Sequence, residues 1–347
     1  MKIVTCASYY GTGSSAVTDL IGEYEGVKSL GDYEFAFAHE LDGISDLEFH
    51  LVNCPDRHKS GHALKRFERI SHFNAGRWFN KRYEPYFNGQ YWRLTEEYIN
   101  SILEFKYKGY SFRELYEHGL VFYYAQSFLK QALKKVGIRL NVLPKSYLYY
   151  AQPSEQEFLE KTKCYTSQLL AAANPEHAPF LMVDQLLPSS NINRCLRYFE
   201  SNVQVLVVDR DPRDVYLANK FVWHVSQVPI DVKAFCQWFE YTHRAGRHEQ
   251  WDKTKVLKIN FEDIIYRYPD TKARLEQFLG LVPDVHIQQF RRMNPKRSVV
   301  NTQLWKKYDD AENIRIIEKE LKDYLFDYTT CENNEIMGIE PINNTVF

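Results

Sequence analysis

Short apolar runs that end at polar loops and alternate with helix-like segments are the feature that most constrains how this chain folds. Four such runs are rich in branched residues, as buried strands are. They are 2–6 ("KIVTC"), 179–185 ("PFLMVDQ"), 203–210 ("VQVLVVDR") and 255–263 ("KVLKINFED"). A segment with helical spacing follows each run, and strands joined by helical crossovers pair in parallel. We therefore expect an α/β fold with a central parallel sheet flanked by helices.

The segment 44–137 interrupts this alternation. Its residues have helical spacing with aromatic and basic side chains interleaved, and the strand–helix pattern resumes after it. We interpret 1–347 as a single domain that carries 44–137 as a helical insertion, with acceptor binding as its candidate role. The alternating run 33–39 and the run 145–151 are predicted as further strands, and 153–173 as a helix that has Pro153 in its first turn.

Composition narrows the function classes. The 44 basic and 45 acidic residues give a formal net charge of −1, which argues against a protein that coats nucleic acid. Six cysteines are scattered without a CxxC pair, so we predict no metal site and reduced thiols. The first residues lack the pattern of a signal peptide, and no apolar run reaches about 20 residues. We expect a cytoplasmic protein without a membrane span.

The loop in "ASYYGTGSSAVTDLIGEY" (7–24) joins the first predicted strand to a helix that Thr12 or Ser14 would cap. Backbone N–H groups and a helix N-terminus at the end of a strand form an anion site. The loop is not a Walker A motif, because Ser14 stands where the lysine is required. It also lacks the third glycine of a dinucleotide fingerprint. An ordinary strand–helix turn that uses glycine for positive φ is the alternative interpretation.

Arg210 ends the run 203–210, at the sheet edge where doubly wound folds bind ligands. A guanidinium there can bind a phosphate through two parallel hydrogen bonds. The alternative is a surface Arg–Asp pair with Asp211, which precedes a helix start at Pro212.

Taken together, four segments resemble those of sulfotransferases that use 3′-phosphoadenylyl sulfate (PAPS). The segment "SYYGTGSSAV" (8–17) resembles the 5′-phosphosulfate loop of that family, and "DRDPRDVYLANKF" (209–221) resembles its 3′-phosphate segment. The segments "LKINFEDIIYRYPDTKARLEQFLGL" (257–281) and "NPKRSVVNTQLWKKY" (294–308) resemble its strand–loop–helix unit and the C-terminal segment that folds over the cofactor. The four occur in the family's order, and the resemblance is to bacterial-type carbohydrate sulfotransferases, which implies a P-loop-like three-layer fold.

This resemblance implies PAPS as sulfuryl donor, without a metal, and a set of cofactor-binding residues. They are Gly11, Thr12, Gly13, Ser14, Ser15, Ala16, Arg210, Asn219, Lys296, Arg297 and Trp305. Two positions depart from the family pattern. Gly11 occupies the place of a basic residue, and Ala218 that of a serine, with Asn219 beside it as a substitute donor. For the missing cation, Lys296, Arg297 and Lys28 remain open alternatives.

The implied reaction is in-line sulfuryl transfer to a hydroxyl of a carbohydrate or glycolipid acceptor, assisted by N–H donors and a general base. Asp184, beside Gln185 at the end of the strand 179–185, is the first candidate for the base, and a turn or capping carboxylate is its alternative role. His39 and Glu40 are second candidates, although a histidine here is more often a core residue. Small-molecule donor and acceptor are the expected partners, with no nucleic acid.

Four residues of the insertion are candidates for contact with a sugar ring. They are Trp78, Tyr83, Trp92 and Arg93. Aromatic faces stack on pyranose rings, but core packing explains most aromatics at helical spacing. Two other functions stay open. A P-loop nucleotide phosphotransferase lacks its lysine here. A non-catalytic nucleotide- or glycan-binding module would bind adenosine 3′,5′-bisphosphate without turnover.

Overall fold

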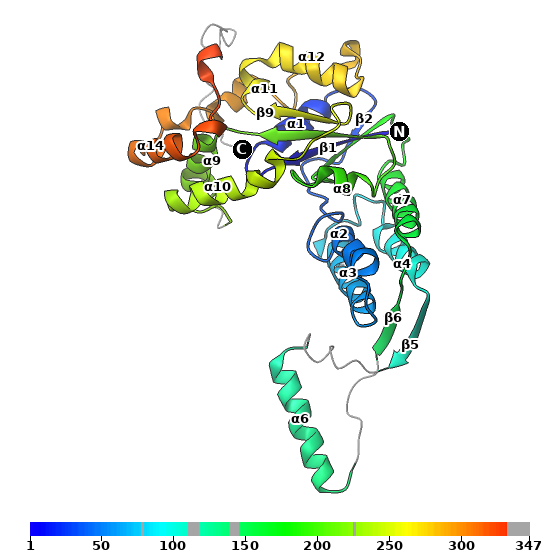
Figure 1. The fold of residues 1–347 in the computed structure, drawn as a ribbon. Helices are drawn as coiled ribbons and strands as arrows, with labels where there is room; N and C mark the ends of the chain where they lie inside the picture. The colour runs from blue at the N-terminus through cyan, green and yellow to red at the C-terminus, as the bar shows by residue number, and fades with distance from the viewer. Residues whose placement is uncertain (78–79, 110–117, 139–145, 225–226, 332–347) are drawn as a thin grey trace.

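The centre of the fold is a five-stranded parallel sheet in the order β2-β7-β1-β8-β9. Its strands are β1 (Lys2–Ser8), β2 (Val27–Ser29), β7 (Phe180–Asp184), β8 (Val203–Asp209) and β9 (Val256–Asn260). The structure, a computed structural model, describes residues 1–77, 80–109, 118–138, 146–224 and 227–331. The predicted parallel sheet flanked by helices is confirmed (Figure 1).

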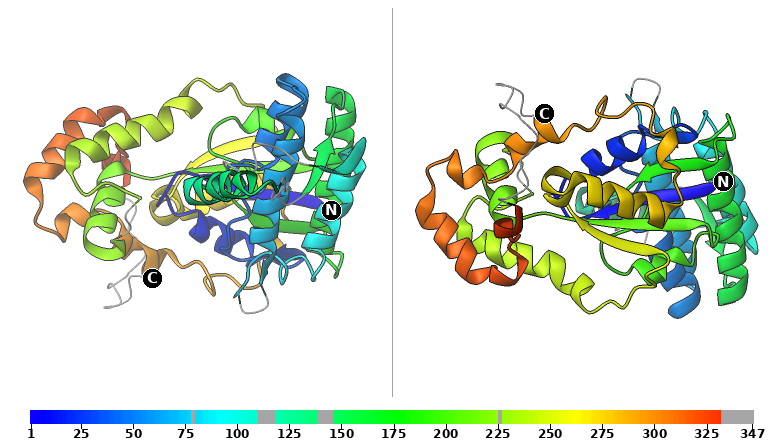
Figure 2. Two further views of the ribbon diagram at one scale, coloured as in Figure 1. Left: turned by 90° about the horizontal axis from the view of Figure 1, so that it is seen from below. Right: turned by 90° about the horizontal axis from the view of Figure 1, so that it is seen from above.

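Side chains on successive residues of β1 enter two different cores. Val4 and Cys6 pack with α1 (Ser14–Ile21), α11 (Asp263–Tyr266) and α12 (Tyr268–Leu279) on one face. Ile3 and Ala7 pack on the other face, whose core includes residues of α7 (Glu155–Ala172) and α8 (Ile192–Leu196). Burial on both faces explains why β7 and the centre of β8 are apolar without alternation. Figure 2 shows helices on both sides of the sheet.

Between β2 and β7 the chain leaves the central sheet. This part contains α2 (Ile44–Glu48), a π-helical turn (Phe49–Asn53), α3 (Ser60–Ala75), β3 (Gly76–Arg77), β4 (Asn80–Lys81), α4 (Tyr91–Ile102), β5 (Phe105–Gly109), α6 (Leu120–Lys135) and β6 (Ser146–Tyr150). The strand predicted at 145–151 exists as β6, but it pairs antiparallel with β5 and not with the central sheet. The part outside the sheet therefore reaches beyond the predicted end at residue 137.

A third apolar cluster lies beyond the end of β8. It is formed by α9 (Pro212–Ala218), α10 (Val232–Arg247) and α14 (Ala311–Glu320). Shorter elements complete the C-terminal half: a π-helical turn (Asn219–Trp223), α13 (Pro295–Ser298) and the 3-10 turns Pro283–Val285, Val299–Asn301, Leu304–Lys306, Lys322–Tyr324 and Tyr328–Cys331.

Three local predictions are wrong. The run 33–39 forms no strand, because it makes a single strand-like bond, from Phe35 N to Asp184 O at 3.1 Å, and then turns. The N-cap of α1 is Gly13 in a left-handed conformation, which neither Thr12 nor Ser14 supplies. Ser154 caps α7 in a capping box with Glu157, so Pro153 precedes the helix.

Two kinds of feature are absent from the described residues. No helix among them has the length and apolarity needed to cross a bilayer. No group of three or more His, Cys, Asp or Glu side chains in the same residues is arranged to hold a metal ion.

Candidate functional site

The carboxyl ends of β1, β7 and β8 meet at one edge of the sheet, because the three strands are adjacent and parallel. A cavity of about 660 Å³ opens there. Its lining residues are Ser8, Tyr9, Tyr10, Gly11, Thr12, Gly13, Ser14, Ser15, Asp32, Glu34, Asp184, Gln185, Arg210 and Trp223. The structure thus brings the loop after β1 together with Asp184 and Arg210, which are far apart in the sequence.

The two glycines of the loop are required by conformation and by space. Gly11 has φ 74° and Gly13 has φ 86°, values that side-chain-bearing residues rarely adopt. A Cβ on Gly11 would lie 2.8 Å from a ring carbon of Trp223, and one on Gly13 would lie 2.5 Å from a ring carbon of Phe261. The loop therefore presents bare backbone at the N-terminus of α1, where helical N–H groups lack partners within the helix.

The hydroxyl groups of the loop have different roles. Thr12 is buried, and its hydroxyl lies 2.9 Å from Tyr9 O and 2.8 Å from Val208 O. It anchors the loop to β8 and does not face a ligand. Ser14 donates its hydroxyl to Asp184 Oδ2 at 3.2 Å. Ala16 lies one residue further into α1 than the last loop residue that lines the cavity.

Arg210 joins three segments of the chain. Its side chain donates from Nη1 to Gly11 O at 3.0 Å and from Nη2 to Asn301 O at 2.6 Å. The guanidinium lies 4.9 Å from the ring centre of Phe261 and 5.5 Å from that of Trp223. Only 2 % of the residue is exposed, and its Nε has no hydrogen-bond partner among the described residues. A buried donor without a partner at a cavity wall is suited to an anionic ligand.

Asp184 is a buried carboxyl at the end of β7, with 2 % of the residue exposed. Burial, with the nearby charge of Glu34, raises its pKa from 3.8 to about 7. Ser14 Oγ and Gln185 N, the latter at 3.0 Å from Oδ1, donate to the carboxyl and hold its orientation. Gln185 has φ 54° and donates its side-chain amide to Ser8 Oγ. This carboxyl therefore changes its charge near neutral pH inside the cavity.

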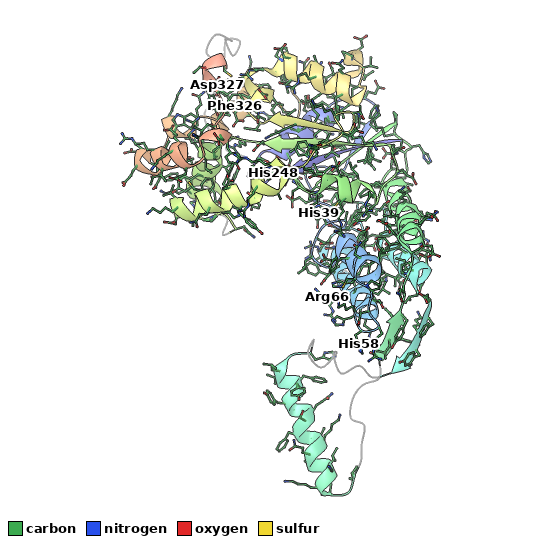
Figure 3. All side chains as sticks on the ribbon, in the orientation of Figure 1. His39, His58, Arg66, His248, Phe326 and Asp327 are labelled. Carbon is green, nitrogen blue, oxygen red and sulfur yellow. The ribbon has the colours of Figure 1, made fainter. Side chains whose placement is uncertain are left out.

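His39 and Glu40, the second candidates for the base, are not among the described residues that line the cavity. His39 has Nε2 2.9 Å from Gln185 O, and burial lowers its pKa. It lies between the central sheet and helices α2 and α3 in Figure 3. Glu40 accepts a hydrogen bond from Asn74 Nδ2 at 2.5 Å, and burial raises its pKa to about 7.

Two of the predicted substitutes for missing family residues are directed elsewhere. Asn219 is buried, and its side-chain amide donates to Val228 O at 3.0 Å, away from the cavity lining. Lys28 pairs with Glu176 at 2.9 Å. It lies beside Leu181, near the amino end of β7, whereas the cavity is at the carboxyl end. Position in the strand therefore argues against Lys28 as the missing cation.

The basic residues of the C-terminal segment are not among the described residues that line the cavity. Lys296 and Arg297 are exposed on α13, and Arg297 donates to Arg292 O at 2.7 Å. Trp305 covers the guanidinium of Arg213, whose central carbon lies 3.8 Å from the ring centre. These residues belong to the same C-terminal half as Asn301, whose carbonyl does reach Arg210.

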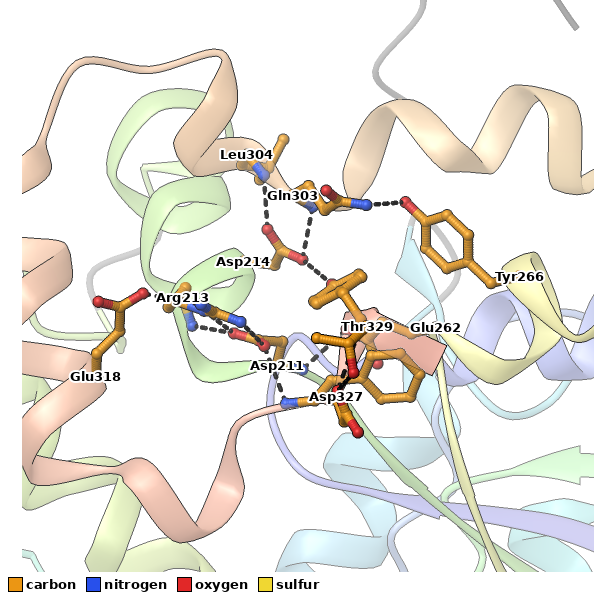
Figure 4. A network of polar contacts seen from close by, with 12 residues as sticks. Asp211, Arg213, Asp214, Glu262, Tyr266, Gln303, Leu304, Glu318, Asp327 and Thr329 are labelled. Carbon is orange, nitrogen blue, oxygen red and sulfur yellow. Dashed lines mark hydrogen bonds and ion pairs between the residues drawn. The ribbon is translucent and has the colours of Figure 1, made fainter. Parts of the chain in front are cut away.

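Buried carboxylates fasten this C-terminal part to the start of α9 (Figure 4). Asp214 accepts hydrogen bonds from Gln303 N at 3.0 Å, Leu304 N at 2.8 Å and the Tyr328 hydroxyl at 3.0 Å. Asp211 accepts from Phe326 N and forms an ion pair with Arg213. Burial raises the pKa of Asp214. The segment that supplies the Asn301 carbonyl is thus held by main-chain bonds to side chains of α9.

The residues proposed for acceptor contact have other surroundings. Tyr83 is a core residue whose hydroxyl accepts from Ala36 N at 3.1 Å. Trp92 packs edge-on against His72, and Arg93 is exposed and paired with Glu97. Trp78 lies outside the described residues. Tyr83, Trp92 and Arg93 belong to the described residues, and none of them lines the cavity.

Sequence reasoning missed several lining residues. Asp32 and Glu34 follow β2, whose parallel pairing with β7 carries them toward Asp184. Their position after a strand was a usable signal. Trp223 ends a π-helical turn after α9, and Tyr9 stacks on His243 with ring centres 3.7 Å apart. Nothing in the sequence pattern distinguishes these two rings from the many others.

Comparisons with known proteins give a limited result. No protein-family model and no curated relative matches the sequence. Among solved structures, the chain is similar to sulfotransferase STF1 from Mycobacterium tuberculosis, with 12% identity, 93% of this chain and 76% of that chain covered, and TM-score 0.36. It is also similar to sulfotransferase STF9 from Mycobacterium avium, with 10% identity, 98% of this chain and 77% of that chain covered, and TM-score 0.38. A third similar structure is retinol dehydratase in complex with androsterone and the inactive cofactor PAP, with 16% identity, 94% of this chain and 81% of that chain covered, and TM-score 0.35. Identities and TM-scores as low as these establish neither a family nor a function.

Proposed function

We propose that this protein transfers a sulfuryl group from PAPS to a hydroxyl of a carbohydrate or glycolipid acceptor. The observation that carries the proposal is the common cavity of three groups: the loop 11–15, the buried Arg210 and the carboxyl of Asp184. An anion cradle, a guanidinium donor and a carboxyl with a near-neutral pKa are the parts that such a transfer requires.

The residues present fit a phosphorylated donor. The loop brings backbone without side chains at Gly11 and Gly13 to the N-terminus of α1, where an anion can accept hydrogen bonds from main-chain N–H groups. Arg210 keeps one nitrogen without a partner at the cavity wall. We assign the sulfuryl-bearing end of the donor to the loop and a phosphate group to Arg210. When bound, PAPS supplies the activated sulfuryl group and the phosphate that leaves.

Asp184 would take the proton of the acceptor hydroxyl. Ser14 and Gln185 N hold the carboxyl in one orientation, and its pKa of about 7 suits a base that works near neutral pH. Glu34 lines the same cavity, and its negative charge helps to keep that pKa high. The proton ends on Asp184 and is released to water when the product leaves.

A second function has one observation in its favour. Arg210 is the one lysine or arginine among the described residues that line the cavity, whereas three of those residues are carboxylic acids. Catalysis of transfer between anionic groups normally uses several cations. A protein that binds adenosine 3′,5′-bisphosphate without turnover would need fewer.

The deciding experiment follows labelled sulfate from PAPS to a panel of sugars and glycolipids, with calorimetry of adenosine 3′,5′-bisphosphate binding. We expect transfer and binding by the wild type, and loss of both in Arg210→Ala. Arg213→Ala is the matched control, because it removes a buried guanidinium of the same helix start that lies outside the described cavity wall. Binding without transfer to any acceptor would support the second function, and absence of both would refute the proposal.

A further inference from the structure

Helix α6 (Leu120–Lys135) exposes large apolar side chains, which a helix in water normally buries. Val121 is 86%, Tyr124 65%, Phe128 76% and Leu129 44% exposed, whereas Gln126 is buried. The helix lies apart from the central sheet and its helical layers in Figure 1. Contiguous exposed apolar surface of this kind marks an interaction site.

The exposed apolar residues form a stripe along one side of the helix. Val121, Ala125, Phe128 and Ala132 recur at intervals of four and three residues, which places them on the same face. The neighbouring ring of Tyr124 widens this stripe. A face of this width is normally turned toward a core, and here it is turned outward.

Charge indicates what the stripe contacts. The described run 118–138 contains Lys130, Lys134 and Lys135 and no aspartate or glutamate. Lys134 and Lys135 are exposed in the last turn of α6. An apolar stripe on a helix that carries lysines and, over this run, no acidic residue is complementary to a surface that is both apolar and anionic. A bilayer that contains acidic lipids is such a surface.

The length of α6 decides how it meets a bilayer. Sixteen residues extend about 24 Å, less than the ~30 Å of a hydrocarbon core, and the lysines at one end favour the headgroups. We propose that α6 lies in the plane of an anionic membrane surface, with Val121 and Phe128 inserted among the acyl chains. This inference does not rest on the proposed sulfotransferase function.

The antiparallel strand pair β5–β6 also exposes side chains that suit a membrane surface. Phe105, Tyr107 and Tyr147 are exposed on it, and the amino groups of Lys106 and Lys108 lie over the ring of Tyr147. Aromatic rings combined with lysine are typical of surfaces at the headgroup level of a bilayer. In Figure 1 this strand pair lies between the helices α3 and α4 and the helix α6.

The test is sedimentation of the full chain with vesicles of phosphatidylcholine containing phosphatidylserine, and with vesicles of phosphatidylcholine alone. We expect binding to the first kind, at least ten-fold weaker binding to the second, and weakening by salt. The double variant Val121→Asp/Phe128→Asp should no longer sediment. Tyr241→Asp, at an exposed ring on α10, is the matched control and should bind like the wild type. Lys134→Gln and Lys135→Gln should each weaken binding by roughly five-fold.

Equal thermal unfolding temperatures of the variants and the wild type would show that the changes act at the surface. Sedimentation equilibrium distinguishes the main competing occupant, a second copy of this chain. A dimer that Val121→Asp/Phe128→Asp converts to a monomer, together with no vesicle binding by the wild type, would overturn the proposal. Unaltered vesicle binding by the double variant would overturn it as well.

Discussion

The charge state of Asp184 should affect both the stability of the protein and the rate of the proposed transfer. Its pKa is raised from 3.8 to about 7 because the folded protein removes the carboxyl from water and places Glu34 near it. The folded state therefore keeps a proton that the unfolded state loses. Stability supplied by the protonated form is complete below pH 3.8 and is lost as the pH rises through about 7.

The size of this effect follows from the shift. About three pKa units correspond to about 4 kcal/mol of unfolding free energy, at 1.36 kcal/mol for each unit. Asp184→Asn cannot ionise, so the difference in unfolding free energy between wild type and variant should change by about 4 kcal/mol between pH 3.8 and about 7. Denaturant titrations at a series of pH values measure this difference.

The same carboxyl must be ionised to accept a proton. The rate of sulfate transfer by the wild type should therefore rise with pH and level off above about pH 7. Asp184→Asn should lower turnover by roughly 10²–10⁴-fold, lose this rise and leave bisphosphate affinity nearly unchanged. Ser14→Ala removes a donor to the ionised form and should move the rise to higher pH.

Glu40→Gln is a matched control, because burial also raises the pKa of Glu40 to about 7 but the residue is not in the described cavity wall. It should alter the pH dependence of stability and leave the pH dependence of the rate intact. The reasoning about Asp184 is refuted if Asp184→Asn keeps the rise of the rate near pH 7. Equal losses of turnover and bisphosphate affinity would assign Asp184 a structural role.

Three further outcomes are expected. Arg210→Ala removes charged donors from the carbonyls of Gly11 and Asn301, so we expect a loss of about 3 kcal/mol in denaturant titrations as well as the loss of bisphosphate binding. Gly13→Ala must move the ring of Phe261 and should cost roughly 2–4 kcal/mol in the same assay, whereas Gly31→Ala, also at positive φ but with no atom within 4 Å, should cost only about 1 kcal/mol. Asp214→Ala removes the acceptor of three hydrogen bonds and should speed hydrogen exchange of the amides of Gln303 and Leu304 at least ten-fold. Unchanged protection of these amides would contradict the attachment of this segment to α9.

The sheet was predictable because burial on both faces leaves a strong local signal. The run 203–210 contains four consecutive apolar residues, 205–208, and strand–helix alternation implies parallel pairing. The edge of the sheet at which Asp184 and Arg210 meet follows from that pairing. The assignment of the glycine loop to the phosphosulfate end of a donor rests on the resemblance to sulfotransferase segments and stays a prediction.

The departures from expectation concern two side chains that bind main-chain carbonyls and one run that forms no strand. Asn219 was expected to face a phosphate, but its direction is set by a π-helical turn and by the carbonyl of Val228. Arg210 was expected to bind a phosphate through two parallel hydrogen bonds, and in the structure its Nη1 and Nη2 donate to the carbonyls of Gly11 and Asn301. The run 33–39 alternates like a strand, but among the described residues only its Phe35 N makes a strand-like bond, to Asp184 O.

The strand order has a consequence for the newly made chain. β1 is synthesised first, yet its two neighbours in the sheet are β7 and β8, which begin at Phe180 and Val203. At roughly 5–20 residues per second, a ribosome needs about ten to forty seconds to proceed from Ser8 to Asp184. During that time an apolar strand has no partner for its main chain. Protection of this segment by a chaperone or by the ribosome surface is therefore most needed until β7 has been synthesised.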